Sequence, residues 1–337
     1  MFFSSSIGID MGSSNTRVYS SGKGIVFNQP TMVAVRGSEF EVLGMGDSAR
    51  DLVRCASVGI SIMRPITGGV IADWELAKIM LSGVMKTVSM QEKRSGLKAV
   101  LTVPAGITQM ERETFEETAA AAGLRDVVLI DAPIVAALGE GLDISGPEGH
   151  MIVDVGGGKT EASVVALDGI ISNEMVRVGG DTMNRRIVDF VRDKTGVVIG
   201  ESVAEILKIN ADGAEDVMQF KGRSVDTGLP ANVRVSKNEV KEALAPCTAE
   251  IMEMIKRMLH KTAPEMMGDI VENGVLLTGG GARTVHLKEQ LQQFLGLNVH
   301  LARDPGCTIA AGIGAAIEKM NPVVRRADEK QRILAQN

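Results

Sequence analysis

One pattern occurs twice in this chain, in positions far apart. The segment IGIDMGSSNTRVY matches MIVDVGGGKTEAS, which places Asp10 on Asp154 and Thr16 on Thr160. A few residues later, GIVFN falls on GIISN. Each copy is typical of a strand, a tight turn, a second strand and, after another turn, a third. Two distant copies of one such unit predict two related halves, because a solenoid would need many short repeats.

Strand-like and helix-like segments alternate along the rest of the sequence. LKAVLTVPAG is predicted to be a buried strand that Pro104 stops, and DVVLIDAP to be another. TQMERETFEETAAAAGL is predicted to be a helix with Thr108 as its N-cap, and PIVAALGEGL a helix with Pro133 in its first turn. Strands that alternate with helices predict an α/β fold with largely buried sheets.

The composition excludes several classes of protein. A length of 337 residues favours about two domains. The net charge of −6 argues against nucleic acid as a partner. The three cysteines, Cys55, Cys247 and Cys307, form no Cys-x-x-Cys pair, so neither a zinc site nor a disulfide framework is expected. No apolar run reaches the ~18 residues that span a bilayer, and the start of the chain lacks the features of a signal peptide.

Each copy of the repeat puts an aspartate at a strand end, before a turn rich in glycine and polar side chains. Glycine lets the backbone approach a phosphate closely, and consecutive N–H groups in such a turn form an anion-binding nest. The two carboxylates suit Mg²⁺ through its coordinated waters. One such turn alone would indicate an ordinary hairpin, but two matched turns predict a magnesium nucleotide held between the halves. The side-chain donors expected there are Ser13, Ser14, Asn15 and Thr160.

The string GGGKT is not the end of a Walker A loop. That loop needs a glycine five residues before its last glycine, and counting back from Gly158 gives Val153. Two more glycine turns follow, RVGGD and VLLTGGGART. The second is predicted to begin a helix directly after its glycines and to lie under an adenine ring, where a side chain would clash.

The order of these turns resembles the actin/Hsp70/sugar-kinase superfamily. From about residue 7 to 317, the chain resembles the MreB/Mbl family of bacterial actins, in the stretches KGIVFNQPTMVAV, MRPITGGVIADW, VPAGITQMER, VDVGGGKTEASVVALDGI, VRVGGDTMN, TGLP, VLLTGGGA and ARDPGCTIAAGIGAA. The resemblance implies an α/β actin-like fold: two related halves with RNase H-like sheets, each with a smaller subdomain, and a nucleotide cleft between them. The expected bounds are 1–145 for the first half, with a small subdomain at about 33–65; 146–310 for the second half, with a small subdomain at about 181–245; and 311–337 for a C-terminal segment that returns to the first half.

The resemblance also implies ATP and Mg²⁺ as ligands. The metal is expected at Asp10 and Asp154, through water. The residues expected to bind the nucleotide are Asp10, Gly12, Ser13, Ser14, Asn15, Asp154, Gly156, Gly157, Gly158, Lys159, Thr160, Gly179, Gly180, Asp181, Glu205, Ile206, Leu207, Lys208, Gly279, Gly280, Gly281 and Ala282.

Two positions that place the attacking water in the family are altered here. The family usually has Glu-Glu-Pro where this chain has Asp131-Ala132-Pro133, and threonine where it has Lys159. Ala132 offers no proton acceptor, so hydrolysis is predicted to be weak or slow. Asp131, Lys159 and Thr160 are the candidate catalytic residues, although Asp131 is expected to point away, since neighbours in a strand face opposite sides. Lys159 is either a solvated side chain at the rim or an ammonium that reaches the γ-phosphate.

The family implies a cytoplasmic cytoskeletal ATPase that forms antiparallel double filaments on the inner face of the membrane. Its expected partners are its own copies, the membrane surface, and membrane proteins of cell shape and wall synthesis. Phe2 and Phe3 would act as a wedge and Lys93 and Arg94 would meet anionic lipid, unless these are a frayed end and a solvated turn.

The main alternative is a small-molecule, sugar-type kinase, although no extra carboxylate stands near the second turn to act as its base. An Hsp70-like switch would need a substrate-binding domain beyond this chain, and a dehydrogenase would need Gly-x-Gly-x-x-Gly after the first strand.

Overall fold

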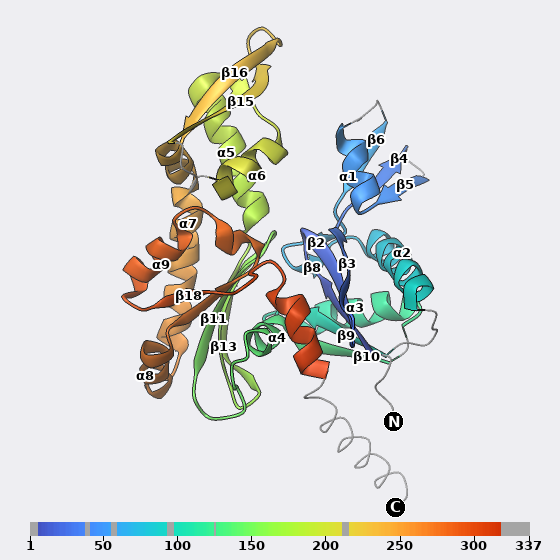
Figure 1. Ribbon diagram of the computed structural model, residues 1–337, viewed down its shortest axis with the longest axis vertical. Helices are drawn as coiled ribbons and strands as arrows, with labels where there is room; N and C mark the ends of the chain where they lie inside the picture. The colour runs from blue at the N-terminus through green and yellow to red at the C-terminus, as the bar shows by residue number, and fades with distance from the viewer. Residues whose placement is uncertain are drawn as a thin grey trace, which may run out of the picture. The chain divides into compact units, whose positions relative to one another are not determined.

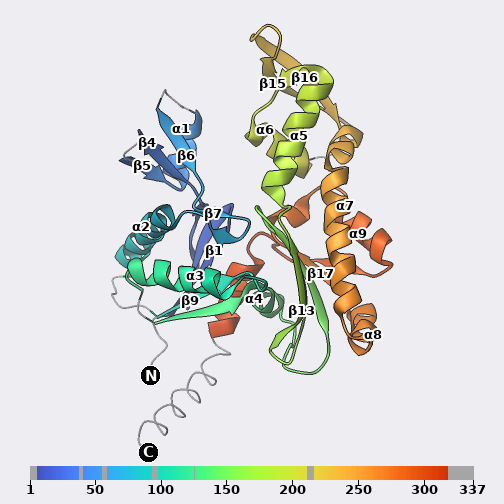
Figure 2. The ribbon, with the colours of Figure 1, turned by 180° about the vertical axis from the view of Figure 1, so that it is seen from behind.

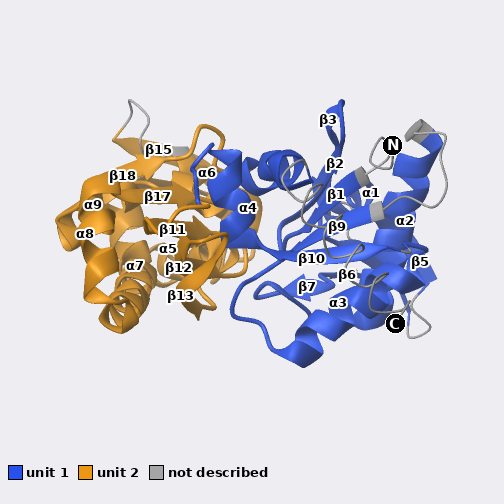
Figure 3. Ribbon diagram, turned by 90° about the horizontal axis from the view of Figure 1, so that it is seen from below, with its two compact units in different colours: residues 1–144, 307–337 blue, residues 145–306 orange. Residues whose placement is uncertain are grey.

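The computed structural model describes residues 6–37, 41–54, 59–92, 98–124, 126–210 and 216–317. Figure 1 follows the chain from blue to red, and Figure 2 shows it from behind. The chain divides into two compact units, coloured in Figure 3. Unit 1 comprises residues 1–144 and 307–337, and unit 2 comprises residues 145–306. Each unit contains one five-stranded sheet.

The five-stranded sheet of unit 1 has the order β10-β9-β1-β2-β3. Its first three strands along the chain form an antiparallel meander, and β9 and β10 continue the sheet in parallel with β1. Their runs of apolar residues fit strands that are covered on both faces. The strands are β1 (Ser6–Met11), β2 (Asn15–Ser20), β3 (Gly24–Pro30), β9 (Lys98–Val103) and β10 (Val127–Asp131).

The five-stranded sheet of unit 2 repeats this topology in the order β13-β12-β11-β17-β18. Again three strands form an antiparallel meander and two more run parallel to its first strand. The repeat found in the sequence is therefore confirmed, and it extends to the whole sheet. The strands are β11 (His150–Val155), β12 (Thr160–Ala166), β13 (Gly169–Val176), β17 (Val275–Thr278) and β18 (Val299–Leu301).

Smaller sheets accompany the large one in each unit. In unit 1, β5-β4-β6 forms a three-stranded sheet and β7-β8 a two-stranded one; in unit 2, β14-β15-β16 forms a three-stranded sheet. Their bounds are β4 (Val33–Arg36), β5 (Glu41–Met45), β6 (Ile60–Met63), β7 (Ile66–Thr67), β8 (Val70–Ile71), β14 (Val197–Val198), β15 (Val217–Ser224) and β16 (Pro230–Ser236).

Two helices of unit 1, α3 and α4, begin where the sequence predicts. Thr108 caps α3 with a complete capping box, in which Glu111 bonds back to the N-cap. Pro133 lies in the first turn of α4. Residues 308–317 form a further helical segment of unit 1. The named helices are α1 (Asp47–Arg54), α2 (Trp74–Glu92), α3 (Gln109–Ala121) and α4 (Ala132–Gly139).

In unit 2, the long helix α7 packs on β12 and β13 (Figure 2). Ser236 caps it with a second capping box. The three glycines after β17 differ from the prediction of an immediate helix: they lead into a short 3₁₀ turn, η1 (Gly280–Arg283). Thr284 is extended and His286 has φ +56°, so the backbone leaves the helical region before α9 begins. The helices are α5 (Gly180–Thr195), α6 (Glu201–Asn210), α7 (Lys237–Lys261), α8 (Pro264–Asn273) and α9 (Leu287–Leu295).

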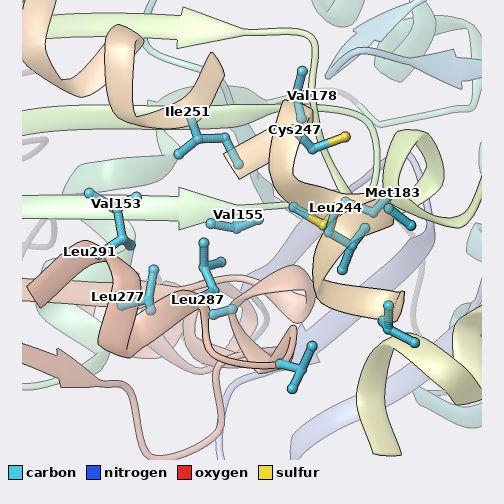
Figure 4. Packing of buried hydrophobic residues seen from close by; sticks show 14 of the residues in the cluster. Val153, Val155, Val178, Met183, Leu244, Cys247, Ile251, Leu277, Leu287 and Leu291 are labelled. Carbon is cyan, nitrogen blue, oxygen red and sulfur yellow. The ribbon is translucent and has the colours of Figure 1, made fainter. Parts of the chain in front are cut away.

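Each unit has its own apolar core. In unit 2, side chains of β11, β17, α5, α7 and α9 pack together, among them Val153, Val155, Leu244 and Cys247 (Figure 4). In unit 1, the equivalent core joins β1, β9, α2 and α3. The two cores hold β1 and β11 in place, and the repeated turns begin where these two strands end.

Residues 308–317 belong to unit 1 and pack against its five-stranded sheet and α4. A Cβ added to Gly8 would lie 1.7 Å from Ile313 Cγ2, and one added to Gly312 would lie 2.0 Å from Val135 O. Both glycines therefore allow a backbone approach that any side chain would block. Among the described helices, none is long and apolar enough to cross a membrane.

Candidate functional site

The first repeated turn, residues 12–15 in unit 1, is closed by its own backbone. Gly12 N donates to Asn15 O at 3.1 Å, and a Cβ on Gly12 would lie 3.0 Å from that oxygen. Thr31, which directly follows β3, supports the turn with two hydrogen bonds. Its N–H donates to Ser14 O at 2.8 Å, and its hydroxyl donates to Gly12 O at 2.6 Å. The turn is thus tight and fixed in shape before any ligand arrives.

Polar side chains of this first turn already have partners within unit 1. Gly69 N donates to the hydroxyl of Ser13 at 3.2 Å, which leaves the hydroxyl proton of Ser13 to donate. Asn15 Nδ2 donates to Asn28 Oδ1 at 3.2 Å. These bonds orient the donors that the sequence predicts for a phosphate.

Asp10, at the end of β1, faces a cation of its own unit. Arg17 lies directly opposite it on β2, and Arg17 Nη1 is 3.6 Å from Asp10 Oδ2. The hydroxyl of Thr102 donates to the other carboxylate oxygen at 3.3 Å. Both charged side chains are mostly buried, with 16% and 14% of their surface exposed. The carboxylate that was predicted to hold magnesium through water therefore has two partners from the protein.

The second repeated turn, residues 156–159 in unit 2, closes in the same way as the first. Gly156 N donates to Lys159 O at 2.8 Å, the counterpart of the bond in the first turn. The RVGGD turn supports it, because Gly180 N donates to Gly156 O at 2.9 Å and Asp181 N to Gly157 O at 2.8 Å. A Cβ on Gly179 would lie 2.5 Å from Gly157 O. The glycines of RVGGD thus hold the second turn in place.

Lys159 is buried beside two carboxylates of unit 2. Only 7% of the residue is exposed, so the interpretation of a solvated side chain is wrong. Its ammonium forms an ion pair with Glu161 and lies 3.7 Å from Asp154 Oδ2. An ammonium has three donors and no acceptor, so this group cannot take a proton from water. That the ammonium of Lys159 reaches a γ-phosphate stays a prediction.

Glu161 is the residue of this site that the sequence reasoning missed. It lies in β12 directly opposite Asp154, and 1% of it is exposed. Besides Lys159, its carboxylate accepts from Asn173 Nδ2 at 2.8 Å. A charge at such depth needs a partner and hydrogen bonds. The available signal was a glutamate inside an otherwise apolar strand, two residues after a lysine.

Thr160 faces into unit 2. It is fully buried, and its hydroxyl donates to Val178 O at 2.6 Å. The proton of this hydroxyl is therefore used inside the unit. The catalytic role predicted for Thr160 stays a prediction. The bond that the structure shows ties the second turn to the segment between β13 and α5.

The glycine cluster after β17 packs on the end of β11. Added Cβ atoms on Gly279 and Gly281 would lie 2.3 Å and 2.9 Å from Val155 O. These two glycines are required by the fold itself. Gly280 differs, because a Cβ there would meet nothing within 4 Å. Open space next to Gly280 is what the prediction of an adenine above this cluster requires.

The predicted adenosine residues on α6 join the same part of unit 2. Lys208 Nζ donates to Glu205 Oε2 at 2.6 Å and to Gly180 O at 3.3 Å. Asn184 Nδ2 also donates to Glu205, at 2.6 Å. Ile206 is 44% exposed, whereas Leu207 is fully buried in the core. Unit 2 thus brings together residues 154–160, 179–181, 205–208 and 279–282.

Asp131 and Ala132 lie where β10 ends and α4 begins. The carboxylate of Asp131 forms an ion pair with Arg112 of α3. Ala132 is 7% exposed and has no polar side-chain atom. The carboxylate of Asp131 thus has a partner on α3, and its orientation relative to a reacting phosphate stays a prediction.

The two predicted ligands differ in how well these residues suit them. The tight turns with oriented donors and the space at Gly280 suit a nucleotide. Magnesium fits less well, because each predicted carboxylate already faces a protein cation. Within the described residues, no group of three or more His, Cys, Asp or Glu side chains is arranged to hold a metal. The predicted membrane residues Phe2, Phe3, Lys93 and Arg94 lie outside the described residues.

Two matched sheets, each with a glycine turn after its first strand, define an actin-like α/β fold. A family model described as "MreB/Mbl protein" matches residues 4–325. The chain therefore belongs to the MreB/Mbl family of bacterial actin-like cell shape proteins.

Similar proteins cover nearly the whole chain. It is 37% identical over 329 residues to the "Cell shape-determining protein MreB" of Escherichia coli (strain K12), which covers 95% of both chains. It is 33% identical over 329 residues to the "Cell shape-determining protein Mbl" of Bacillus subtilis (strain 168), with 96% of this chain and 99% of that protein covered. The crystal structure of MreB5 of Spiroplasma citri bound to AMPPNP matches with a TM-score of 0.89 and 27% identity, over 98% of this chain and 100% of that one.

Proposed function

We propose that this chain is an actin-like cytoskeletal protein that binds ATP and polymerises into filaments that maintain cell shape and guide wall synthesis. The observation that carries the proposal is the pair of matched turns, each closed by a glycine N–H and each placed after the first strand of its sheet. Family membership supports the cell-shape role, since relatives of this length carry that description. The structure of a family member with AMPPNP supports the nucleotide.

ATP hydrolysis by this chain is proposed to be slow. Ala132 has no acceptor for a water proton, and Lys159 carries an ammonium that can only donate. Asp131 is paired with Arg112. The loss of a general acid–base group typically costs about a hundred- to ten-thousand-fold in rate. Binding of ATP, more than its turnover, would then switch the polymer.

The test is sedimentation of the full chain with ATP, with ADP and without nucleotide. A side chain at Gly280 provides a specific block, because it meets open space and not the protein. Gly280→Leu is expected to abolish ATP binding and ATP-dependent pelleting while the chain remains folded. Gly268→Leu is the matched control, since a Cβ at Gly268 also meets nothing within 4 Å. ATP-dependent pelleting of Gly280→Leu at the parent's level would contradict the placement of the nucleotide, and no ATP-dependent pelleting of the parent would contradict the filament.

Association with the inner face of the membrane is part of this proposal. The resemblance of the sequence to bacterial actins implies it. The residues we expect to take part are the basic pair Lys93 and Arg94 and the aromatic pair Phe2 and Phe3. Flotation with vesicles of anionic lipid tests both pairs. Charge reversal at Lys93 and Arg94 is expected to weaken flotation, and unchanged flotation would exclude that segment.

A further inference from the structure

Glu205 is the half-exposed member of a polar group that is otherwise buried in unit 2. The side chain of Glu205 is 45% exposed, whereas Lys208 is 3% exposed and Asn184 is 7% exposed. Glu205 and Lys208 lie on α6, and Asn184 lies on α5. Of these three side chains, Glu205 is therefore the one that a ligand can touch.

The two buried side chains donate to the same oxygen of Glu205. Asn184 Nδ2 and Lys208 Nζ each donate to Glu205 Oε2 at 2.6 Å. Among the residues that the structure describes, none donates to the other oxygen, Oε1. An ionised carboxylate can only accept hydrogen bonds. One oxygen of Glu205 is thus fixed by the protein, and the other is left to accept from a ligand.

The amide of Asn184 is only half satisfied. Its Oδ1 is buried and has no hydrogen-bond partner among the described residues. A buried acceptor without a partner lowers the stability of the fold, and an apolar side chain of the same shape would avoid that loss. What the amide supplies at this position, and leucine could not, is the hydrogen bond from Nδ2 to Glu205.

The same group is joined to the second glycine turn. Lys208 Nζ donates to Gly180 O at 3.3 Å, and Gly180 N donates to Gly156 O at 2.9 Å. A carboxylate oxygen repels phosphate and accepts from a hydroxyl. The sugar of a nucleotide carries hydroxyls and is attached directly to the phosphates. Of the parts of a nucleotide, the sugar is therefore the one that suits Glu205 beside a turn expected to hold phosphate.

We propose that Asn184 is a positioning residue: together with Lys208 it fixes Oε2 of Glu205, so that Oε1 accepts from a ribose hydroxyl and the chain selects ribonucleotides over deoxyribonucleotides. The inference rests on the proposed nucleotide-binding function and names the sugar that the site selects. Glu205 touches the nucleotide, and the two buried side chains act through it.

Calorimetric titration of the full chain with magnesium and ATP, 2′-deoxy-ATP or 3′-deoxy-ATP measures this selection. We expect the parent to bind ATP at least about tenfold more tightly than one of the two deoxy analogues, because a hydrogen bond to a charged group is lost. Inosine triphosphate keeps both hydroxyls but lacks the amino group of adenine. Selection against inosine triphosphate alone would place the base at Glu205 and overturn the proposal.

Asn184→Leu removes the Nδ2 donor and keeps the shape of the side chain. The preference for ATP is expected to fall below about threefold, because Lys208 alone does not hold the carboxylate in one orientation. The Kd of the deoxy analogue should change little. The thermal unfolding temperature should not fall, since the unpaired Oδ1 is removed as well. A purely structural role of Asn184 would instead weaken ATP and both analogues alike and leave the preference unchanged.

The control takes the same amide from a carboxylate elsewhere in unit 2. Asn273 Nδ2 donates to Glu148 Oε1 at 2.9 Å, next to the start of β11 and away from its glycine turn. Asn273→Leu should keep the preference of the parent. If Asn184→Leu does not fold, Asn184→Ala takes its place with the same expected loss.

Equal affinity of the parent for ATP and both deoxy analogues would overturn the inference and leave the proposed nucleotide site intact. An undiminished preference in the Asn184 variant would overturn it as well. Absence of ATP binding by the parent would instead overturn the proposed function.

Discussion

Lys159 Nζ lies 3.7 Å from Asp154 Oδ2, inside the turn that closes the end of β11. Glu161 completes this group, because its carboxylate pairs with the same ammonium and lies opposite Asp154 across the β11–β12 ladder. A cation at this place changes both what the turn can bind and how a bound triphosphate can react.

The buried pair of Lys159 and Glu161 should behave as one unit in stability measurements. Removal of one partner leaves a buried charge without its counter-ion, which typically costs about 3–5 kcal/mol. We expect the loss from Glu161→Gln to be near the lower end of this range, because Asp154 still faces the ammonium. Lys159→Met should cost more, because it leaves two buried carboxylates opposite each other. The double change Lys159→Met/Glu161→Gln should recover part of the loss from Lys159→Met, since one buried carboxylate then remains in place of two. Urea unfolding of the parent, both single variants and the double variant gives the coupling energy, and additive effects would contradict a shared buried pair.

Packing of the segment at 308–317 on α4 should depend on Gly312. A Cβ there would lie 2.0 Å from Val135 O, so Gly312→Ala forces two backbones apart. Overpacking of this kind costs about 1–3 kcal/mol, and we expect a lower thermal unfolding temperature. Gly268→Ala, in α8 and with open space around it, should instead be neutral or stabilising. Equal effects of the two substitutions would show that the close approach is absent.

Glu239 should make stability depend on acid pH through the cap of α7. Hydrogen bonds from the backbone N–H of Ser236, and then from its hydroxyl, lower the pKa of Glu239 from its ordinary value of 4.5. Because the folded pKa is lowered, the contribution is present above pH 4.5 and is lost as the pH falls through the folded pKa. Glu239→Gln keeps the box without the charge and should flatten the pH dependence of the urea midpoint below pH 4.5. An unchanged pH profile would rule out this contribution.

The capping box of α7 also contains an uncharged hydrogen bond, in which the Ser236 hydroxyl accepts from the backbone N–H of Glu239, and Ser236→Ala removes it. Loss of such an N-cap costs about 1 kcal/mol. Thr108→Ala is the matched change in unit 1, since α3 carries the same capping box. Both substitutions should lower the urea midpoint by similar amounts, and no change in either would contradict the capping bonds.

Cys247 should react slowly with alkylating reagents. It lies on α7 with 2% of its surface exposed, and its burial raises the pKa of its thiol, which lowers the share of reactive thiolate. Cys307 is partly exposed and is expected to react before Cys247. Peptide mapping after a time course of iodoacetamide resolves the two sites, and faster labelling of Cys247 would show that α7 opens readily.

Much of the fold was predictable because it is encoded locally. The doubled strand–turn–strand pattern predicts two equivalent sheets, and Thr108 and Pro133 mark helix starts through capping chemistry that needs no tertiary contact. The glycines were predicted as ligand contacts, yet Gly279 and Gly281 are required by the neighbouring end of β11. That requirement appears only when β17 is placed beside β11.

The charge partners of the site were not predictable in the same way. Arg112 meets Asp131 because α3 packs on β10, and the sequence does not state that register. Glu161 meets Lys159 because β12 places it opposite Asp154. Pairs of side chains from different elements depend on three-dimensional packing. The sequence therefore showed that Asp131 and Lys159 are unusual for the family, but it did not show that Arg112 and Glu161 are their partners.

Phosphate release and sedimentation, measured on one sample with ATP and magnesium, show whether ATP binding switches the polymer while turnover stays slow. We expect the parent to pellet and to release little phosphate. Ala132→Glu with Lys159→Thr restores an acceptor for the water proton, so this double variant should release phosphate at least about tenfold faster. Lys159→Thr alone is the control and should stay slow. Brisk phosphate release by the parent, or a double variant no faster than the parent, would show that Ala132 and Lys159 do not limit hydrolysis.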